Sequence, residues 1–271
     1  MTDPLDGSND LAPISKAQVR SARRLLQRKA REAAAEFLVE GTQGVREALS
    51  HPGLVRLLIV DDPLRHHDLL ARAVGVPVVR AETADIAQLS DTVTSQGVFA
   101  VVRDVPARLA DLGEALQLVV ICAQVRDPGN AGTVIRCADA FGADAVILTQ
   151  GSVEATNPKT VRASVGSIFH LPVVEGVGFE EAVDWARGRG LQVLAADAGG
   201  RSLDDLTSSG SLRRPTAWVM GNEAWGLPAE QLAHVDEEVS IPMYGRAESL
   251  NLSTAAAVCL YATASAQRSH Q

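Results

Sequence analysis

The most constraining feature of this sequence is a series of short, almost wholly apolar segments in its second half. They lie at 116–123, 145–149, 171–174, 191–196, 216–220 and 239–243. Strands of a parallel sheet are covered on both faces and therefore read as continuous apolar runs. Helical stretches separate most of these segments, at 131–141, around 159–164, at 179–189 and at 228–234. The alternation predicts a doubly wound, mainly parallel α/β sheet, followed by a terminal helix of small residues from about 250 to 267.

The first half of the chain predicts a separate, smaller α/β domain. Apolar segments alternate there with helical stretches between about residue 37 and residue 102, whereas 103–113 holds a proline and no clear period. We therefore divide the chain into a flexible acidic tail (1–15), a small domain (16–102), a linker (103–113) and a larger domain (114–271).

Charge is distributed unevenly along the chain. The net charge is −8, yet the segment 16–31 contains seven basic residues and no acidic one. A helical wheel of this segment puts nearly all the bases on one face and apolar residues on the other, with Ser15 as the N-cap. A solvated helix face and a phosphate-binding face both fit this pattern. The basic face consists of Lys16, Arg20, Arg23, Arg24, Arg28 and Arg31.

Several classes of protein are disfavoured by the sequence. No apolar run approaches the roughly 18 residues of a membrane helix, and the polar, acidic N-terminus does not resemble a signal peptide. The three cysteines form no CxxC pair, which disfavours disulfides and a zinc site and suits a reducing cytoplasm; we expect no metal. No P-loop motif is present, and the ten aromatic residues form no stacking platform of the kind seen on RNA-binding sheets.

The first of three unusually polar segments, 126–143, follows the first strand of the larger domain. Its Asp-Pro-Gly turn predicts a helix that begins near Asn130, its N-cap, and points at the carboxyl edge of the sheet, where ligands bind. Arg136 lies one helical turn beyond Gly132 and can extend towards that edge, where an arginine suits a phosphate. A surface ion pair between Arg136 and Asp139 is the alternative interpretation.

The other two polar segments follow later strands. WVMGNEAWGLP (218–228) carries Glu223 between glycines that allow a ligand to approach the backbone closely. A carboxylate there favours a cationic or hydroxyl-bearing ligand. IPMYGRAESLNLSTAAAVCLYA (241–262) places Ser249 and Asn251 at the start of a helix of small residues, which a second backbone can approach closely.

In this order and spacing, the motifs NxGxxxR, MGNExxG and IPMxGxxxSLNLSxA resemble the SpoU (TrmH-type) branch of the SPOUT RNA methyltransferases. The resemblance covers about 115–267 and includes NPKTVRASVGSIFHLPV (157–173). Leu252 stands where valine is common. The first domain resembles, less specifically, the L30e-like RNA-binding domain that precedes the catalytic domain in many members. The thiostrepton- and avilamycin-resistance rRNA methyltransferases share this plan, which raises antibiotic resistance as a role.

The resemblance implies a C-terminal SPOUT α/β knot, a deep trefoil through which the terminal helix passes. It also implies a homodimer formed through the C-terminal domain and S-adenosylmethionine as cofactor. The cofactor would contact backbone around Gly221, Ile241 and Leu250. The reaction would be methyl transfer to a ribose 2′-hydroxyl of structured RNA, most often 23S rRNA.

The family motif marks Arg136 as catalytic. A guanidinium is nearly always protonated, so we expect Arg136 to hold the adjacent phosphate and stabilise the developing oxyanion electrostatically. Asn130 and Glu223 would orient Arg136 or the ribose. Ser249 and Asn251 would hydrogen-bond the nucleotide or fix their loop.

Three alternatives stay open at this point. A non-enzymatic rRNA-binding protein, either a chaperone or a factor that shields a drug site, would keep the basic helix but would need neither Arg136 nor Glu223. The same chemistry on tRNA is a second alternative. A nicotinamide-dependent oxidoreductase is disfavoured, because the turn after the first strand reads DPGNAG and not GxGxxG.

Overall fold

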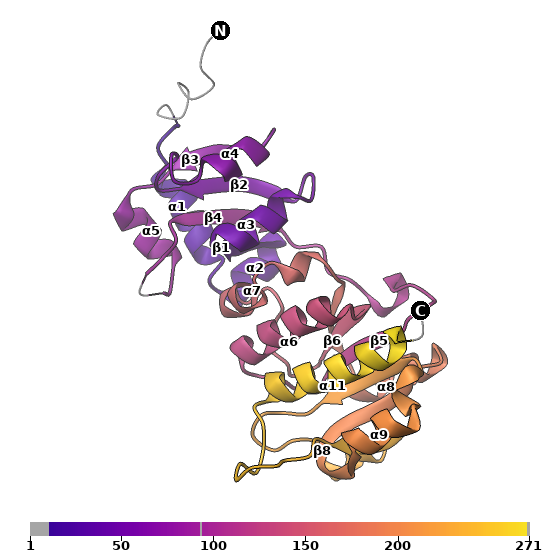
Figure 1. The fold of residues 1–271 in the computed structure, drawn as a ribbon. Helices are drawn as coiled ribbons and strands as arrows, with labels where there is room; N and C mark the ends of the chain where they lie inside the picture. Colours follow the sequence, from indigo (N-terminus) through magenta and orange to yellow (C-terminus); the bar gives the residue numbers. More distant parts are fainter. Residues whose placement is uncertain (1–10, 93, 270–271) are drawn as a thin grey trace. The chain divides into compact units, whose positions relative to one another are not determined.

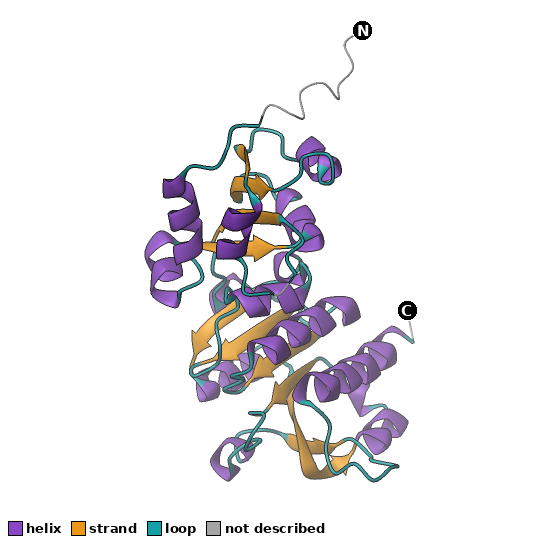
Figure 2. Cartoon of the chain, turned by 90° about the vertical axis from the view of Figure 1, so that its left-hand side faces the viewer, coloured by secondary structure: helices purple, strands orange, loops and turns teal. Residues whose placement is uncertain are grey.

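The computed structural model describes residues 11–92 and 94–269, which form two compact units. The first unit contains the chain up to Val105 together with Thr156–Phe169, and the second contains Pro106–Ala155 and His170–Gln271. Each unit is a β-sheet flanked by helices (Figures 1 and 2). Within the described ranges, no helix has the length and apolar character that crossing a membrane requires.

The sheet of the first unit has four strands in the order β1-β4-β2-β3. β4 pairs antiparallel with both β1 and β2, whereas β2 and β3 are parallel. The strands are β1 (Glu36–Glu40), β2 (Val55–Val60), β3 (Val78–Arg80) and β4 (Val98–Arg103). Because successive side chains of a strand point to opposite faces, β4 contributes Ala100 to one apolar cluster and Phe99 to the other.

Helices cover both faces of this sheet. α1 and α5 pack on the cluster that contains Phe99, and α3, α4 and α7 pack on the cluster that contains Ala100. The helices are α1 (Lys16–Arg24), α2 (Arg28–Ala34), α3 (Thr42–Leu49), α4 (His67–Arg72), α5 (Thr83–Leu89), α7 (Pro158–Ser164) and the 3-10 turn η2 (Ser167–Phe169). The small α/β layer domain predicted from the sequence is therefore present.

The basic segment forms two helices, whereas the helical wheel predicts one. α1 begins at the expected N-cap, Ser15, whose side chain forms a capping box with Gln18. The chain then leaves helical geometry at Gln27, whose backbone is extended, and α2 starts at Arg28. This break changes the phase of the wheel. Arg31 consequently turns inward, 3% exposed, and its Nη1 donates a hydrogen bond to the carbonyl of Leu25 at 3.0 Å.

The ends of the first domain also differ from the sequence-based boundaries. Residues 1–10 of the expected acidic tail lie outside the described residues. The rest of that tail is held along β3, because Ile14 N donates to the carbonyl of Arg80 and Arg80 N donates to that of Ala12. The expected linker, 103–113, is partly taken up by the two units. Arg103 is the last residue of β4, and Ala107 forms an isolated parallel β-bridge with Val174 in the second unit.

Residues 156–169 lie between two strands of the second unit in sequence but pack in the first unit. Val161 is buried in the core there, and the ring of Phe169 stacks on Phe37 with centroids 6.1 Å apart. Arg162 Nη1 lies 2.9 Å from a carboxylate oxygen of Glu40, whose side chain is 9% exposed. The first unit is therefore assembled from two separate stretches of the chain.

The sheet of the second unit has six strands in the order β10-β8-β9-β5-β6-β7. Every pairing in it is parallel, as the apolar runs predict. The strands are β5 (Leu118–Cys122), β6 (Ala145–Thr149), β7 (Val173–Val177), β8 (Gln192–Ser202), β9 (Thr216–Met220) and β10 (Glu237–Ser240). β6 and β9 have the bounds expected from the sequence. β8 runs further than expected, and β10 ends earlier.

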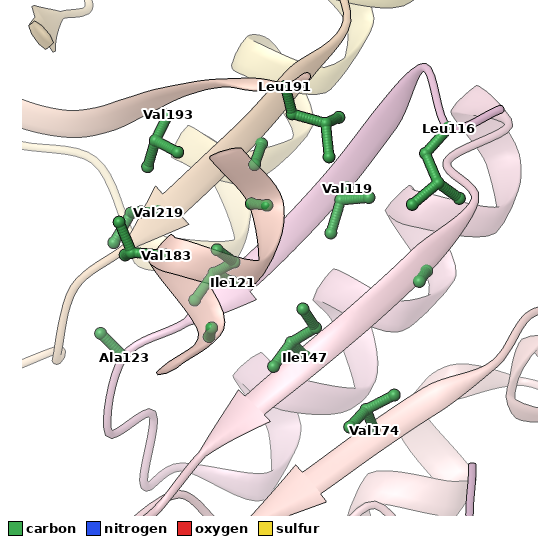
Figure 3. Packing of buried hydrophobic residues seen from close by; sticks show 14 of the residues in the cluster. Leu116, Val119, Ile121, Ala123, Ile147, Val174, Val183, Leu191, Val193 and Val219 are labelled. Carbon is green, nitrogen blue, oxygen red and sulfur yellow. The ribbon is translucent and has the colours of Figure 1, made fainter. Parts of the chain in front are cut away.

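Helices lie on both faces of this sheet. α6 and α11 pack side by side on one face (Figure 1), and α8 covers the other. The helices are α6 (Pro128–Phe141), α8 (Phe179–Gly188), α9 (Leu203–Ser209), α10 (Ala229–Leu232) and α11 (Leu252–Arg268), with 3-10 turns η1 (Leu109–Asp111) and η3 (Ser211–Arg213). Figure 3 shows Val183 of α8 against Ile121 and Val219 in the core of the unit.

The terminal helix α11 is fixed to the sheet by polar contacts. Trp218 in β9 donates from its indole nitrogen to the Thr263 hydroxyl at 2.9 Å, and both side chains are fully buried. Because an unpaired polar group in the core costs free energy, this contact stabilises the packing of α11 on β9. Near the end of the helix, the amide of the partly exposed Gln267 donates to the carbonyls of Gln117 and Arg214. The start of α11 is thereby held at the carboxyl ends of the strands.

Candidate active site

The carboxyl ends of β8, β9 and β10 open into a cavity of about 590 Å3. Its size is that of a site for a drug-sized ligand or a cofactor. Four stretches of the chain form its walls, and all belong to the second unit: 196–198, 220–223 with Gly226, 239–243, and 248–252 with Ala255. Parts of the second and third polar segments of the sequence thus meet around one cavity.

The structure places most of the expected site residues at this cavity. Its walls include the three expected cofactor-contacting positions, Gly221, Ile241 and Leu250. They also include three of the five expected catalytic residues, namely Glu223, Ser249 and Asn251. Asn130 and Arg136 are not among the lining residues.

Two glycines allow the backbone to take the course that forms the cavity. A Cβ on Gly221 would lie 2.7 Å from the carbonyl carbon of Gly226, which is closer than side chains approach. A Cβ on Gly200 would overlap the backbone of Glu238. The pairing between β8 and β10 is interrupted, because β8 leaves β10 after Ala195 and pairs with it again from Arg201. This excursion of β8 ends at Gly200, where the two backbones pass closely. The excursion carries Asp197 to the cavity wall, a position that no sequence motif indicated.

The loop 222–226 after β9 is closed by its own backbone. Asn222 N donates to the carbonyl of Gly226, and Gly226 N donates to that of Asn222, both at 2.9 Å. The Asn222 side chain is buried, and its Nδ2 donates to the carbonyl of Gln124 at 2.7 Å. Asn222 therefore ties this loop to the one after β5. Although it lies within the MGNE motif, our sequence analysis did not select it as a site residue.

Glu223 is held at the N-terminal end of α6. Its carboxylate accepts hydrogen bonds from the backbone nitrogens of Arg126 at 3.2 Å and Asp127 at 3.1 Å. It also accepts one from Asn130 Nδ2 at 3.3 Å. Unpaired N–H groups and the helix dipole both favour a negative charge at this place. The carboxylate therefore joins the loop after β9 to the helix after β5.

Asn130 and Asn251 extend this contact to α11. Asn251 Nδ2 donates to Asn130 Oδ1 at 3.0 Å, and Asn251 Oδ1 accepts from the backbone nitrogen of Ser253 at 2.9 Å. Asn251 is thereby the N-cap of α11. The sequence-based expectation that Asn130 caps α6 is wrong. Asp127 is that cap, because its carboxylate accepts from Asn130 N at 2.8 Å, and Asn130 lies in the first turn.

Arg136 lies on the exposed side of α6 and makes no hydrogen bond or ion pair within residues 11–92 and 94–269. The alternative pairing with Asp139 does not form, because Asp139 contacts His170 Nδ1 at 2.8 Å. The guanidinium is consequently available to a ligand, although it does not belong to the cavity wall of its own chain.

The cavity is acidic. Its walls contain the carboxylates of Asp197, Glu223 and Glu248 and no lysine, arginine or histidine. Beside it, burial and, to a smaller extent, the charge of Glu223 raise the pKa of the Cys122 thiol to about 12. Such a thiol stays protonated at neutral pH and is a poor nucleophile. The electrostatics favour a ligand that carries positive charge at the cavity.

The expected RNA-contacting bases divide into two groups. Those of α1 lie exposed, and so does Arg28, which pairs with Glu32 at 2.7 Å. Arg31 is the exception, because its buried guanidinium serves the fold; burial also raises the pKa of Asp104, and the charge of Arg31 partly offsets this. The exposed bases of α1 are Lys16, Arg20, Arg23 and Arg24.

Nowhere in the described part of the chain do three or more His, Cys, Asp or Glu side chains gather in a way that could hold a metal ion.

Comparison with known proteins identifies the class to which this fold and cavity belong. The model of the SpoU rRNA Methylase family matches residues 117–261, and that of the MRM3-like substrate binding domain matches residues 16–100. The chain therefore belongs to the SpoU rRNA methylase family. The family expected from the three motifs is confirmed.

Particular relatives span nearly the whole chain. It is 35% identical to the 23S rRNA (guanosine(2553)-2′-O)-methyltransferase RlmP of Bacillus subtilis (strain 168), over 90% of this chain and 94% of that protein. It is 34% identical to the 23S rRNA (uridine(2479)-2′-O)-methyltransferase of Streptomyces viridochromogenes, over 86% and 84%. The SpoU methyltransferase AviRb from Streptomyces viridochromogenes in complex with AdoMet superposes with a TM-score of 0.82 at 30% identity, over 94% of this chain and 99% of that one.

These similarities confirm three further expectations at the level of the family. The second unit has the SPOUT fold of the solved SpoU enzymes, preceded by a small substrate-binding domain. The class is that of RNA methyltransferases. The cofactor of the class is S-adenosylmethionine, which is bound in the AviRb structure.

Proposed function

We propose that this chain transfers the methyl group of S-adenosylmethionine to a ribose 2′-hydroxyl of 23S rRNA. The observation that carries the proposal is the acidic cavity at the carboxyl ends of β8, β9 and β10, where two of the three family motifs meet. The two named relatives act on 23S rRNA but on different bases, guanosine in one and uridine in the other. The shared substrate is therefore the ribose of 23S rRNA, and the base is specific to each enzyme.

The cavity fits the proposed cofactor in size and in charge. S-adenosylmethionine supplies an electrophilic methyl group on a positively charged sulfur. Carboxylates with no opposing base in the wall suit this positive charge. Gly221, Ile241 and Leu250 lie in the wall, where their backbone N–H and carbonyl groups would bind the adenine and the methionine part.

Arg136 is our proposed catalytic residue. A ribose hydroxyl is a weak nucleophile. As its oxygen bonds to the methyl carbon in line, the carbon–sulfur bond would break, S-adenosylhomocysteine would leave, and the hydroxyl proton would pass to water. A permanently charged guanidinium close to the ribose and its phosphate lowers the pKa of that hydroxyl and fixes its position. Because Arg136 does not line the cavity of its own chain, we place it in a site completed by a second subunit.

The other expected catalytic residues act, in this proposal, by position. Asn130 hydrogen-bonds to both Glu223 and Asn251, and this chain of contacts holds α6, the loop after β9 and the start of α11 in one arrangement. Ser249 is exposed at the cavity wall and can donate a hydrogen bond to the nucleotide. Fixed geometry of this kind lowers the entropic part of the barrier.

The first unit would dock the RNA. The exposed bases of α1 carry four positive charges on a chain of net charge −8, so a polyanion would be attracted to this face and repelled elsewhere. Arg28 extends the face at the start of α2. We further propose a homodimer through the second unit and a cytoplasmic location.

The proposal is tested with purified protein, labelled S-adenosylmethionine and unmodified 23S rRNA transcribed in vitro. We expect stoichiometric transfer of label and, by mass spectrometry, one 2′-O-methylated nucleotide. Sedimentation of the same protein tests the dimer. Cofactor binding without transfer to any rRNA would contradict the proposal.

The same measurements separate the alternatives. A non-enzymatic rRNA-binding protein would bind rRNA but give no heat with S-adenosylmethionine in calorimetry. An enzyme that acts on tRNA would label a tRNA pool and leave 23S rRNA unlabelled. If the mapped nucleotide lies in an antibiotic-binding site, a deletion strain should become more sensitive to that antibiotic.

A further inference from the structure

Trp225 differs from the other tryptophans of the chain in its exposure. The sequence contains three tryptophans. Trp218 is fully buried and Trp185 is half-buried against the core, whereas Trp225 is 48% exposed. A single exposed aromatic ring is not unusual in itself. Its position and its neighbour indicate a function.

The loop that carries Trp225 is held by several hydrogen bonds. The two backbone hydrogen bonds between Asn222 and Gly226 close the loop, and the buried Asn222 side chain anchors it to Gln124. Glu223 anchors it a second time, to the backbone nitrogens of Arg126 and Asp127. A ring on such a loop can bind a flat ligand with little loss of conformational freedom.

One face of the indole is covered by a cation from another loop. The guanidinium carbon of Arg126 lies 4.9 Å from the centroid of the Trp225 ring. This is the geometry of a cation–π pair. Across the described residues, the Arg126 side chain makes no hydrogen bond or ion pair, so its N–H groups are available to a ligand anion.

The chain contains a second pair of the same kind that serves as an internal comparison. Arg189 lies over Trp185 at 5.6 Å, both at the end of α8. There the guanidinium donates to the carbonyls of Leu112 and Gly113, and the indole packs against the core. The polar groups and the ring of that pair are thus used by contacts within the protein. The pair of Trp225 and Arg126, in contrast, presents both a ring and N–H donors to solvent.

The exposed pair lies beside the cavity. Glu223 and Gly226, on either side of Trp225 in its loop, both belong to the cavity wall. A ribose whose 2′-hydroxyl reaches the cavity therefore brings a base and a phosphate close to Trp225 and Arg126. An aromatic face next to an unpaired guanidinium complements both parts of a nucleotide.

We propose that Trp225 and Arg126 form a stacking platform for an unpaired base of the RNA substrate at or next to the methylated nucleotide. The indole stacks on the base, and the guanidinium contacts the neighbouring phosphate. This inference rests on the proposed function. The platform could not be predicted from the sequence, because its two members are far apart in the chain and the ring lies on a loop, not on a sheet.

The test uses the full-length protein and unmodified 23S rRNA transcribed in vitro. Trp225→Ala should weaken RNA binding about 5- to 150-fold, the range for loss of one base–aromatic stack. Trp225→Phe should retain most of the affinity, because it keeps an aromatic face. Arg126→Ala should lower the salt dependence of binding by about one phosphate contact. Calorimetry with S-adenosylmethionine checks that each variant is folded.

Fluorescence gives a readout specific to stacking. The rRNA should quench the emission of the wild-type protein, whereas polyphosphate, which has charge but no bases, should not. The quenching should vanish in Trp225→Phe and persist in the matched control, Trp185→Phe.

Unchanged affinity and quenching in Trp225→Ala would overturn the inference and leave the proposed function intact if that variant still methylates rRNA. A change in sedimentation with unchanged RNA affinity would also overturn it, because Trp225 would then be a subunit contact. Failure of the wild-type protein to methylate any rRNA would instead refute the proposed function.

Discussion

The candidate site in the second unit and the basic face of α1 in the first unit hold their polar side chains in opposite ways. In the candidate site, Asn130 hydrogen-bonds to both Glu223 and Asn251, and the Glu223 carboxylate alone accepts three hydrogen bonds. In the first unit, the bases of α1 extend into solvent without a partner among the described residues. The former arrangement fixes a geometry, and the latter maintains an electric field.

This difference teaches how each unit should respond to change. A preorganised network is short-ranged, so salt affects it little, but the loss of one member alters the whole. An exposed cationic face acts at long range, so salt weakens it and the loss of each charge adds to the last. Arg136 and Arg31 are exceptions to this contrast, because Arg136 is unpaired near the network and Arg31 is a buried base of the cationic segment; they give the sharpest tests.

Arg136 is an exposed cation without a partner among the described residues, although Glu223, Asn130 and Asn251 of the same unit are paired. If it acts on the ribose, Arg136→Ala should reduce the single-turnover methylation rate at saturating cofactor at least about a hundredfold, or roughly 2.7 kcal/mol of barrier. Cofactor affinity should hold. Arg136→Lys should rescue little, because an ammonium lacks the planar fork. Arg213→Ala, at an exposed arginine of the same unit, is the control; equal rates in both alanine variants would refute the catalytic assignment.

The cationic face of α1 should respond as a field does. Replacing Arg20, Arg23 and Arg24 by alanine should reduce rRNA affinity by about 10- to 100-fold at 0.1 M salt, with a loss of roughly 0.7–0.9 in the salt slope per phosphate contact. The comparison requires that S-adenosylmethionine affinity stay constant. Filter binding across a salt series measures the slope. An unaltered slope would show that this face is solvated and does not bind phosphate.

Arg31 belongs to the same basic segment but does not contribute to its exposed positive charge. Its guanidinium is buried and donates to the carbonyl of Leu25. Arg31→Ala should therefore lower the free energy of unfolding by about 1–3 kcal/mol, the cost of leaving a buried polar partner unsatisfied. The salt slope of RNA binding should not change. Denaturant titration and filter binding together decide the matter, since a changed slope with unchanged stability would contradict the structure.

Glu223 tests whether the paired network behaves as a unit. Glu223→Gln keeps the shape but removes the charge, and because the side chain is exposed we expect a modest effect, about a fivefold slower methylation or roughly 1 kcal/mol. Combined with Asn130→Ala, the two losses should not add, because Glu223→Gln weakens and Asn130→Ala removes the same contact. Strict additivity in the double-mutant cycle would show that the residues act separately.

The parts of the fold predicted best from the sequence are those that local pattern determines. β6 and β9 have the predicted bounds because each is a short apolar run with a clear boundary at both ends: Asp144 and Gln150 flank β6, and Pro215 and Gly221 flank β9. The N-cap at Ser15 was equally local. The break at Gln27 could not be predicted, because 25–34 contains good helix formers and neither glycine nor proline. Tertiary packing of Leu25 and Arg31 decides it.

The candidate site was predictable only in part. The site residues were predicted from motifs that occur in the order found in the SpoU family. Six of the eight expected catalytic and cofactor-contacting residues line the cavity. The hydrogen-bond partners were not predictable, because Asn130 bonds to both Glu223 and Asn251, which lie far from it in sequence. Asp197 had no signal at all, since the excursion of β8 that positions it depends on the close passage at Gly200.

The placement of 156–169 in the first unit has a consequence for how the protein is made. The chain leaves the ribosome from its N-terminus, and domains generally fold as they emerge. The first unit cannot complete its core on emergence of residue 105, since Val161 and Phe169 are still to be synthesised. Until then the apolar surface on β1 that will meet them stays uncovered. The nascent chain must therefore begin the second sheet, through β5 and β6, before the first unit can close.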